Sequence, residues 1–214
     1  MKHIGKGAEP RSLTEHRMRQ HADYDNYPYA DKDELRRALL SEQGRICCYC
    51  MQRISEETCK IEHWASQDGH EDRQLEYSNL LAACPGGEGY STHLQHCDTR
   101  KAEQDITINP ADRLHNCENM IRYQPDGEIY SDQENINNDL NVTLNLNLQT
   151  LKSNRKNALD GAIEGLTRAK PDGAWSRAFL ENAKNEWQAR AADNSFKPYC
   201  TIVVAYIDKK LNRL

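Results

Sequence analysis

The chain has 214 residues, of which 37% are hydrophobic and 29% charged, and its formal net charge is −5. No stretch approaches the about 20 apolar residues that cross a bilayer, and the negative charge is unlike that of a free-standing nucleic-acid binder, which displays a basic surface. The first residues lack an apolar signal core, so we expect a cytoplasmic protein whose eight cysteines bind metal rather than form disulfides.

The N-terminal half predicts short elements separated by loops. Residues 1–28 are polar and predict an extended arm with a short helix at 13–21. Leu35, Leu39 and Leu40 share one face of a helix expected at 31–43, which Gly44 ends. The remaining expectations are a hairpin at 46–54, a short strand at 59–64, a helix or loop at 77–83 and a helix at 98–104.

The C-terminal half predicts mainly helices. Pro125, Asp126 and Gly127 form a turn sequence between two short apolar runs, which is typical of a small hairpin. The Asn-rich stretch 135–147 contains regularly spaced leucines and is therefore expected to be ordered. Three helices are expected at 148–169, 174–192 and 199–211.

Four cysteines have spacings that favour a structural zinc site. Cys47 and Cys50 form a Cys-x-x-Cys turn, which points both thiolates at one tetrahedral ion. Cys84 and Cys97 would complete the site, although their spacing is wider than that of a standard zinc knuckle. The alternative is that all four are reduced core cysteines, which the tight first pair makes less favourable. Three further cysteines stand alone and are interpreted as structural: Cys59, Cys117 and Cys200.

A second set of residues lies between and just after the cysteine pairs. Glu62 offers a hard oxygen ligand suited to Mg²⁺ or Mn²⁺, and Asp98 is our second expected ligand to this catalytic metal. A neutral His63 would accept the proton of the attacking water. A lone Glu-His pair does not by itself indicate a catalytic site. It indicates one here because it lies between the two cysteine pairs.

Three more residues complete the predicted site. Asn79 is expected to position the loop that carries His63, although a helix cap or turn residue is nearly as good an interpretation. Lys101 lies one helical turn after Asp98 and is predicted to bind phosphate. His96 is a further candidate for phosphate binding or metal ligation.

This order of residues resembles the zinc-stapled HNH (ββα-metal) nucleases. Two departures are Glu62, where Asp is usual, and Asp98, where His or Asn is usual; the long loop between Cys84 and Cys97 is also atypical. Similarity to PtuB-type HNH proteins of Septu and retron anti-phage systems extends to the N-terminal Met1-Lys2-His3-Ile4 and to Pro198-Tyr199-Cys200. The matching motif residues are Cys47, Cys50, Glu62, His63, Asn79, Cys84, Cys97, Asp98 and Lys101.

The resemblance implies an α+β fold with a nuclease core at 29–115 holding structural Zn²⁺, a helical extension at 116–214, and an arm at 1–28 that docks on a partner. It implies an endonuclease that cuts nucleic acid, with DNA favoured, and a PtuA-like ATPase partner. Association with a retron would add a reverse transcriptase and its RNA–DNA product. Two alternatives stay open: the same nuclease acting on RNA such as tRNA, and a non-catalytic zinc-stabilised module that binds nucleic acid or protein.

Overall fold

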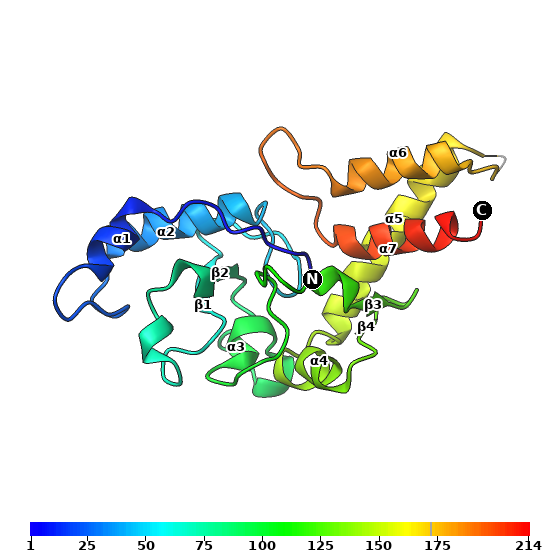
Figure 1. Ribbon diagram of the computed structural model, residues 1–214. Helices are drawn as coiled ribbons and strands as arrows, with labels where there is room; N and C mark the ends of the chain where they lie inside the picture. The colour runs from blue at the N-terminus through cyan, green and yellow to red at the C-terminus, as the bar shows by residue number, and fades with distance from the viewer. Residues whose placement is uncertain (172) are drawn as a thin grey trace.

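The computed structural model describes residues 1–171 and 173–214. Helix α1 (Arg11–Arg17) and helix α2 (Tyr29–Glu42) lie along one side of the N-terminal lobe (Figure 1). Each begins directly after a proline, Pro10 and Pro28, whose fixed φ suits the start of a helix. Three leucines of α2 are fully buried, which confirms the predicted apolar face: Leu35, Leu39 and Leu40.

The centre of this lobe is a two-stranded antiparallel hairpin followed by a short helix. Strand β1 (Lys60–His63) pairs with strand β2 (Leu80–Ala83), with Glu62 opposite Leu81 and His63 opposite Leu80. Helix α3 (Cys97–Lys101) follows after a loop. The stretch expected as a helix or loop at 77–83 is thus a 3₁₀ turn, η2 (Tyr77–Asn79), that leads into β2.

The expected hairpin around the first cysteine pair is small. A single antiparallel bridge joins Ile46 to Arg53, and the turn between them carries Cys47 and Cys50. Helix α3 ends three residues earlier than expected at 98–104, because Ala102 adopts a positive φ of 49° that stops the helix. Three more 3₁₀ helices lie in the loops: η1 (Glu71–Arg73), η3 (Thr92–Leu94) and η4 (Cys117–Asn119).

The second hairpin and the Asn-rich stretch follow the ββα unit. Strands β3 (Arg122–Tyr123) and β4 (Ile129–Tyr130) flank the predicted turn and confirm that hairpin. The Asn-rich stretch is ordered, as expected, but it is helical: α4 (Glu134–Asn138) continues into one π-helical segment, η5 (Asp139–Thr143). Its leucines Leu140, Leu144 and Leu146 are fully buried in the N-terminal lobe.

Three helices build the C-terminal lobe: α5 (Gln149–Ala169), α6 (Arg177–Gln188) and α7 (Cys200–Leu211). Figure 1 shows α6 and α7 packed side by side, with α5 running from this lobe toward β3 and β4. Leu151 at the start of α5 packs in the first hydrophobic cluster, whereas Leu159 and Leu166 pack in the second. The two clusters therefore meet within α5, and the boundary expected at residue 115 stays a prediction. No helix of the described ranges is long and apolar enough to span a membrane.

The N-terminal arm packs against this chain's own core. Met1 and Ile4 are buried, and the backbone of Ile4 donates to the carbonyl of Pro110. Lys6 forms a buried ion pair with Glu42 at the end of α2 and also donates to the carbonyl of Leu80. The first residues of the arm are thus in contact with the core, and docking of the arm on a partner stays a prediction.

We predict that Glu42→Ala lowers the free energy of unfolding by about 3–5 kcal/mol, because it leaves the ammonium of Lys6 buried without a counter-ion. The carboxylate of Glu42 also accepts hydrogen bonds from the backbone of Gly7 and the hydroxyl of Tyr77. Urea unfolding measures the loss. The matched control is Glu15→Ala, which removes an exposed partner of Arg11 and should change stability by less than about 0.5 kcal/mol. Equal losses in both variants would show that the arm is not held by this pair.

Candidate metal centres and active site

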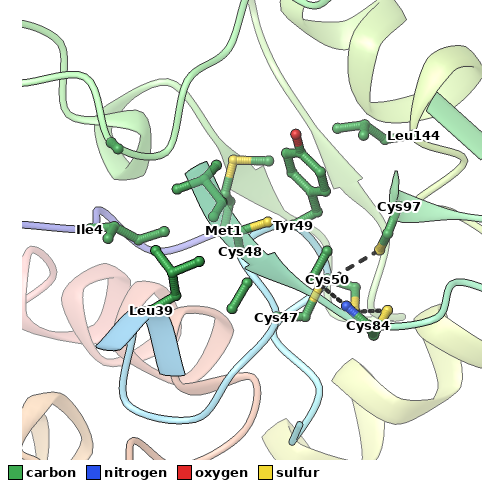
Figure 2. Packing of buried hydrophobic residues seen from close by; sticks show 14 of the residues in the cluster. Met1, Ile4, Leu39, Cys47, Cys48, Tyr49, Cys50, Cys84, Cys97 and Leu144 are labelled. Carbon is green, nitrogen blue, oxygen red and sulfur yellow. Dashed lines mark hydrogen bonds between the residues drawn. The ribbon is translucent and has the colours of Figure 1, made fainter. Parts of the chain in front are cut away.

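The four predicted zinc cysteines come together in the structure. The Sγ atoms of Cys47, Cys50, Cys84 and Cys97 lie within 4.8 Å of one another, and all four residues are buried. The Sγ of Cys47 lies 3.9 Å from that of Cys97, and the Sγ of Cys50 lies 3.8 Å from that of Cys84. Tetrahedral coordination with Zn–S bonds of about 2.3 Å requires S–S separations of about 3.8 Å. Figure 2 shows these side chains converging beside Met1, Ile4 and Leu39.

The local backbone conformation directs the cysteine side chains toward one another. Met51 has a φ of 68°, which reverses the chain after the first pair, and Cys97 has a φ of 55° at the start of α3. The loop between Cys84 and Cys97 closes at its neck, where the backbone of His96 donates to the carbonyl of Gly86. Gly86 also has a positive φ, and a Cβ there would lie 2.1 Å from the His96 carbonyl oxygen. The wide spacing of the second pair is therefore compatible with a tight site.

The donor set fits a structural zinc ion. Burial raises the pKa of Cys47, but hydrogen bonds from the neighbouring cysteine thiols outweigh it and lower that pKa well below its usual value. Burial holds the pKa of Cys97 well above its usual value. Buried thiolates need a cation to compensate their charge, so this cluster is a place for Zn²⁺ bound by four cysteines.

The carboxyl groups of Glu62 and Asp98 lie close enough to shift each other's pKa, and Asp98 directly follows Cys97 of the sulfur cluster. Glu62 is 2% exposed, and burial together with the neighbouring carboxylate of Asp98 raises its pKa well above the usual value. Burial also acts to raise the pKa of Asp98, but its hydrogen bonds with Glu62 and Lys60 outweigh this and lower it. Opposite pKa shifts of this kind are expected of two carboxyl groups that lie close together, and a divalent cation bound between them would relieve their repulsion.

Two lysines compensate this acidic pair. The Nζ of Lys101 lies 3.0 Å from the carboxylate of Glu62 and donates over 2.9 Å to the backbone carbonyl of His63. The Nζ of Lys60 lies 2.8 Å from the carboxylate of Asp98. Each acid thus has its own ammonium, and the ammonium of Lys101 also fixes the end of β1.

The two predicted phosphate-binding residues lie away from solvent. Lys101 is 1% exposed and is engaged by Glu62. His96 is 8% exposed, and its Nδ1 lies 3.1 Å from the Sγ of Cys97. Lys101 thus lies beside Glu62 and His96 beside Cys97, and phosphate binding by either residue stays a prediction.

His63 occupies the end of β1 with its ring fixed. Its Nε2 lies 3.0 Å from the carbonyl oxygen of Gln74, and since a carbonyl can only accept, Nε2 carries the proton and Nδ1 keeps its lone pair. Burial lowers the pKa of His63 to about 4, so the ring is neutral at pH 7. In the part of the chain that the structure describes, no third His, Cys, Asp or Glu ligand atom joins those of Glu62 and Asp98 within 4.8 Å, so His63 is not placed as a third ligand.

Asn79 holds the loop that follows His63. It is fully buried, and its side chain accepts from the backbone N–H of Ala65 and donates to the carbonyls of Ala65 and Arg73. Its backbone carbonyl accepts from the N–H of Trp64. The side chain of Asn79 therefore holds the backbone of the loop that follows His63, which is the first of the two interpretations of the sequence. A catalytic contribution of Asn79 stays a prediction.

Two tyrosines of the site were missed by the sequence analysis. The hydroxyl of Tyr49, within the Cys47–Cys50 turn, donates over 2.7 Å to the carboxylate of Glu62. The ring of Tyr24, from the N-terminal segment, meets the ring of His63 edge-on at a centroid distance of 4.5 Å. The sequence could have indicated Tyr49, because it lies between the two cysteines of the Cys-x-x-Cys turn. No neighbouring motif indicated that Tyr24 belongs to the site.

Comparison with known proteins agrees with this geometry. No protein-family model matches the chain. The chain is similar to an Escherichia coli protein named "Retron Ec83 putative HNH endonuclease", with 28% identity over 131 residues that cover 52% of this chain and 51% of that relative. The chain therefore spans about half the length of the curated relative it matches.

We predict that Cys50→Ser prevents zinc binding and leaves the protein unfolded or insoluble, because a structural zinc site contributes folding free energy directly. The matched control is Cys59→Ser, which changes a buried cysteine outside the four-sulfur cluster. Metal analysis of the control should find one zinc per chain. A folded Cys50→Ser protein with undiminished zinc would contradict the assignment of this cluster.

Proposed function

We propose that this protein is a metal-dependent endonuclease of the HNH type that hydrolyses phosphodiester bonds of nucleic acid. The observation that supports it best is the buried carboxyl group of Glu62 near the partly exposed carboxyl group of Asp98, with a neutral, oriented His63 at the end of β1. These groups stand on a ββα unit beside a four-cysteine cluster, and the retron-linked relative points to the same chemistry.

In this proposal Glu62 and Asp98 hold the catalytic cation. Both are hard oxygen donors, so Mg²⁺ or Mn²⁺ is the expected ion. When bound, it would stabilise negative charge on the scissile phosphate and on the leaving 3′ oxygen. The hydrogen bond from Tyr49 fixes one oxygen of Glu62, and the ammonium of Lys101 lies 3.0 Å from the same oxygen.

His63 acts as the general base. Its Nε2–H bond to the carbonyl of Gln74 fixes the tautomer, which leaves the Nδ1 lone pair to accept a proton from water. The water oxygen then bonds to phosphorus while the P–O bond to the leaving oxygen breaks, and that oxygen takes a proton from solvent. Because the pKa of His63 is about 4, the base form predominates at pH 7.

The substrate and partners are a finer part of the proposal. We favour DNA and a role as the effector of an anti-phage complex with an ATPase of the PtuA-like class, on the strength of the resemblance in sequence. The similarity to a retron-encoded relative adds a reverse transcriptase and its RNA–DNA product as candidate partners. RNA such as tRNA remains the alternative substrate, because the proposed chemistry needs no 2′-hydroxyl.

We predict that His63→Ala lowers the cleavage rate by about 10²- to 10⁴-fold, the usual contribution of a general base. The assay incubates the purified protein with plasmid DNA and, in parallel, with tRNA in the presence of Mg²⁺ or Mn²⁺. Zinc content and thermal unfolding should match the parent, which separates lost chemistry from lost folding. Cleavage by His63→Ala at the parental rate would refute the role of His63, and a parent that cuts neither substrate would favour a non-catalytic zinc module.

We further predict that Tyr49→Phe raises the Mg²⁺ or Mn²⁺ concentration needed for half-maximal cleavage by about tenfold, because Glu62 loses the hydrogen bond that orients it. Loss of partners that orient metal ligands typically costs 10- to 100-fold in metal affinity or activity. The phenyl ring keeps the packing, so zinc content should not change.

Tyr77→Phe is the matched control for this measurement. Tyr77 is also buried, and its hydroxyl also donates to a glutamate, in this case Glu42 at 2.8 Å and outside the site. The Tyr77→Phe variant should need the same Mg²⁺ or Mn²⁺ concentration for half-maximal cleavage as the parent. An equal shift in both variants would mean that the effect of Tyr49 is one of general stability.

A further inference from the structure

A pocket in the C-terminal lobe is not used by the proposed chemistry. It lies between β3, α5 and α7 and has a volume of about 180 Å³. Figure 1 shows these three elements side by side, and none of them carries a residue of the proposed active site. The pocket is smaller than the about 300–1,000 Å³ of sites for drug-sized ligands, so it suits one planar ring rather than a whole nucleotide.

The floor of this pocket is apolar and aromatic. Leu159 of α5 and Ile202 of α7 lie at its base, and the rings of Tyr123 and Tyr206 line its walls. The hydroxyl of Tyr123 is engaged by the N-terminal amino group of Met1 and by Thr201, so that ring is held in one position. Fixed aromatic rings around an apolar base favour a flat ligand that stacks.

The rim of the pocket is basic. Ten residues line the pocket, of which three are basic and none is acidic, in a chain with 33 acidic and 28 basic residues. Lys209, Lys210 and Arg213 supply this charge, and none of them forms an ion pair within the described residues. Lys210 lies over the ring of Tyr206 at 5.3 Å. Basic residues in the last turn of a helix can serve simply to offset the helix dipole. At the C-terminal end of α7, however, Arg177 already donates a hydrogen bond to the carbonyl of Leu211.

Gln124 adds a polar group at the edge of the same pocket. It is exposed, and its side-chain amide has no hydrogen-bond partner among the described residues, so both its donor and its acceptor are available to a ligand. A nucleobase edge presents the same two kinds of group. The pocket thus combines stacking rings, an amide and a basic rim in one place.

We propose that this pocket binds one unpaired base of a single-stranded nucleic acid, with the flanking phosphates on Lys209 and Arg213. The base enters between Tyr123 and Tyr206, which a paired base could not do, so single strands bind more tightly than duplex. This inference rests on the proposed function in one respect: the strand is the nucleic acid that the Glu62–Asp98 site cuts. The basic rim of the pocket would thus give this acidic protein a local positive surface that binds the phosphates of its substrate.

Binding is tested in the His63→Ala background, where cleavage does not consume the probe. The assay measures fluorescence anisotropy of a labelled 12-nucleotide DNA strand and of the same RNA strand. Ala205→Phe fills the pocket without changing charge and should weaken binding roughly 5- to 100-fold, the cost of one lost stacking contact. Ala205→Leu provides a smaller filler if the phenylalanine variant does not fold, and Ala178→Phe on the exposed face of α6 should bind like the parent.

The charge contribution is tested by Lys209→Gln combined with Arg213→Gln. Loss of two phosphate contacts should lower the slope of log Kd against log salt by about 1.4, at about 0.7 per contact on single strands. Arg19→Gln combined with Arg113→Gln removes two exposed cations elsewhere that form no ion pair within the described chain, and should leave the slope unchanged.

The outcomes separate the pocket from the nuclease. Three results would each refute the proposal that the pocket binds an unpaired base. These are unchanged binding by both Ala205 variants, equal binding of duplex and single strand, and no binding by the parent. A parental protein that cuts no nucleic acid but whose strand binding depends on Ala205 would refute the proposed function and keep the pocket.

Discussion

The four-sulfur cluster is the constraint on which the rest of this structure depends. It joins a turn at Cys47 and Cys50, the end of β2 at Cys84 and the start of α3 at Cys97, segments separated by up to 50 residues. The ββα unit has strands of four residues and a helix of five, which are too short to be stable alone. A metal ion at the sulfurs would supply the folding free energy that such short elements lack.

The acidic pair depends directly on that constraint. Tyr49 projects from the turn between two of the cysteines to the carboxylate of Glu62, while Asp98 follows Cys97 in sequence. Any displacement of the cluster would therefore move both carboxyl groups relative to β1. Two buried acids in contact repel each other unless a proton, an ammonium or a metal ion lies between them. Lys60 and Lys101 supply ammonium groups at the outer sides of the pair.

The two lobes are linked by single elements that serve both. Helix α5 begins in the core of the ββα lobe and ends in the core of the helical lobe. The buried guanidinium of Arg155, near its start, donates to the carbonyls of Gly127 and Leu146, which ties the helix to the second hairpin and to the Asn-rich stretch. The N-terminal arm contributes at the same place, because the amino group of Met1 donates to Tyr123. These contacts connect the lobe of the proposed active site to the lobe that carries the pocket on α7.

The sequence by itself determined the elements that depend on local chemistry. The helix Tyr29–Glu42, the three C-terminal helices, the hairpin around Gly127 and the Cys-x-x-Cys turn all follow from apolar spacing and turn residues. The sequence also indicated which side chains form the candidate site, since ligand chemistry is a property of residue type. Only the tertiary structure decided that Lys101 and His96 are buried, that residues 80–83 pair as a strand, and that Met1 and Ile4 of the polar arm are packed. Burial and strand pairing depend on contacts between residues far apart in the chain, and these contacts set the charge state of Glu62 and His63 as well.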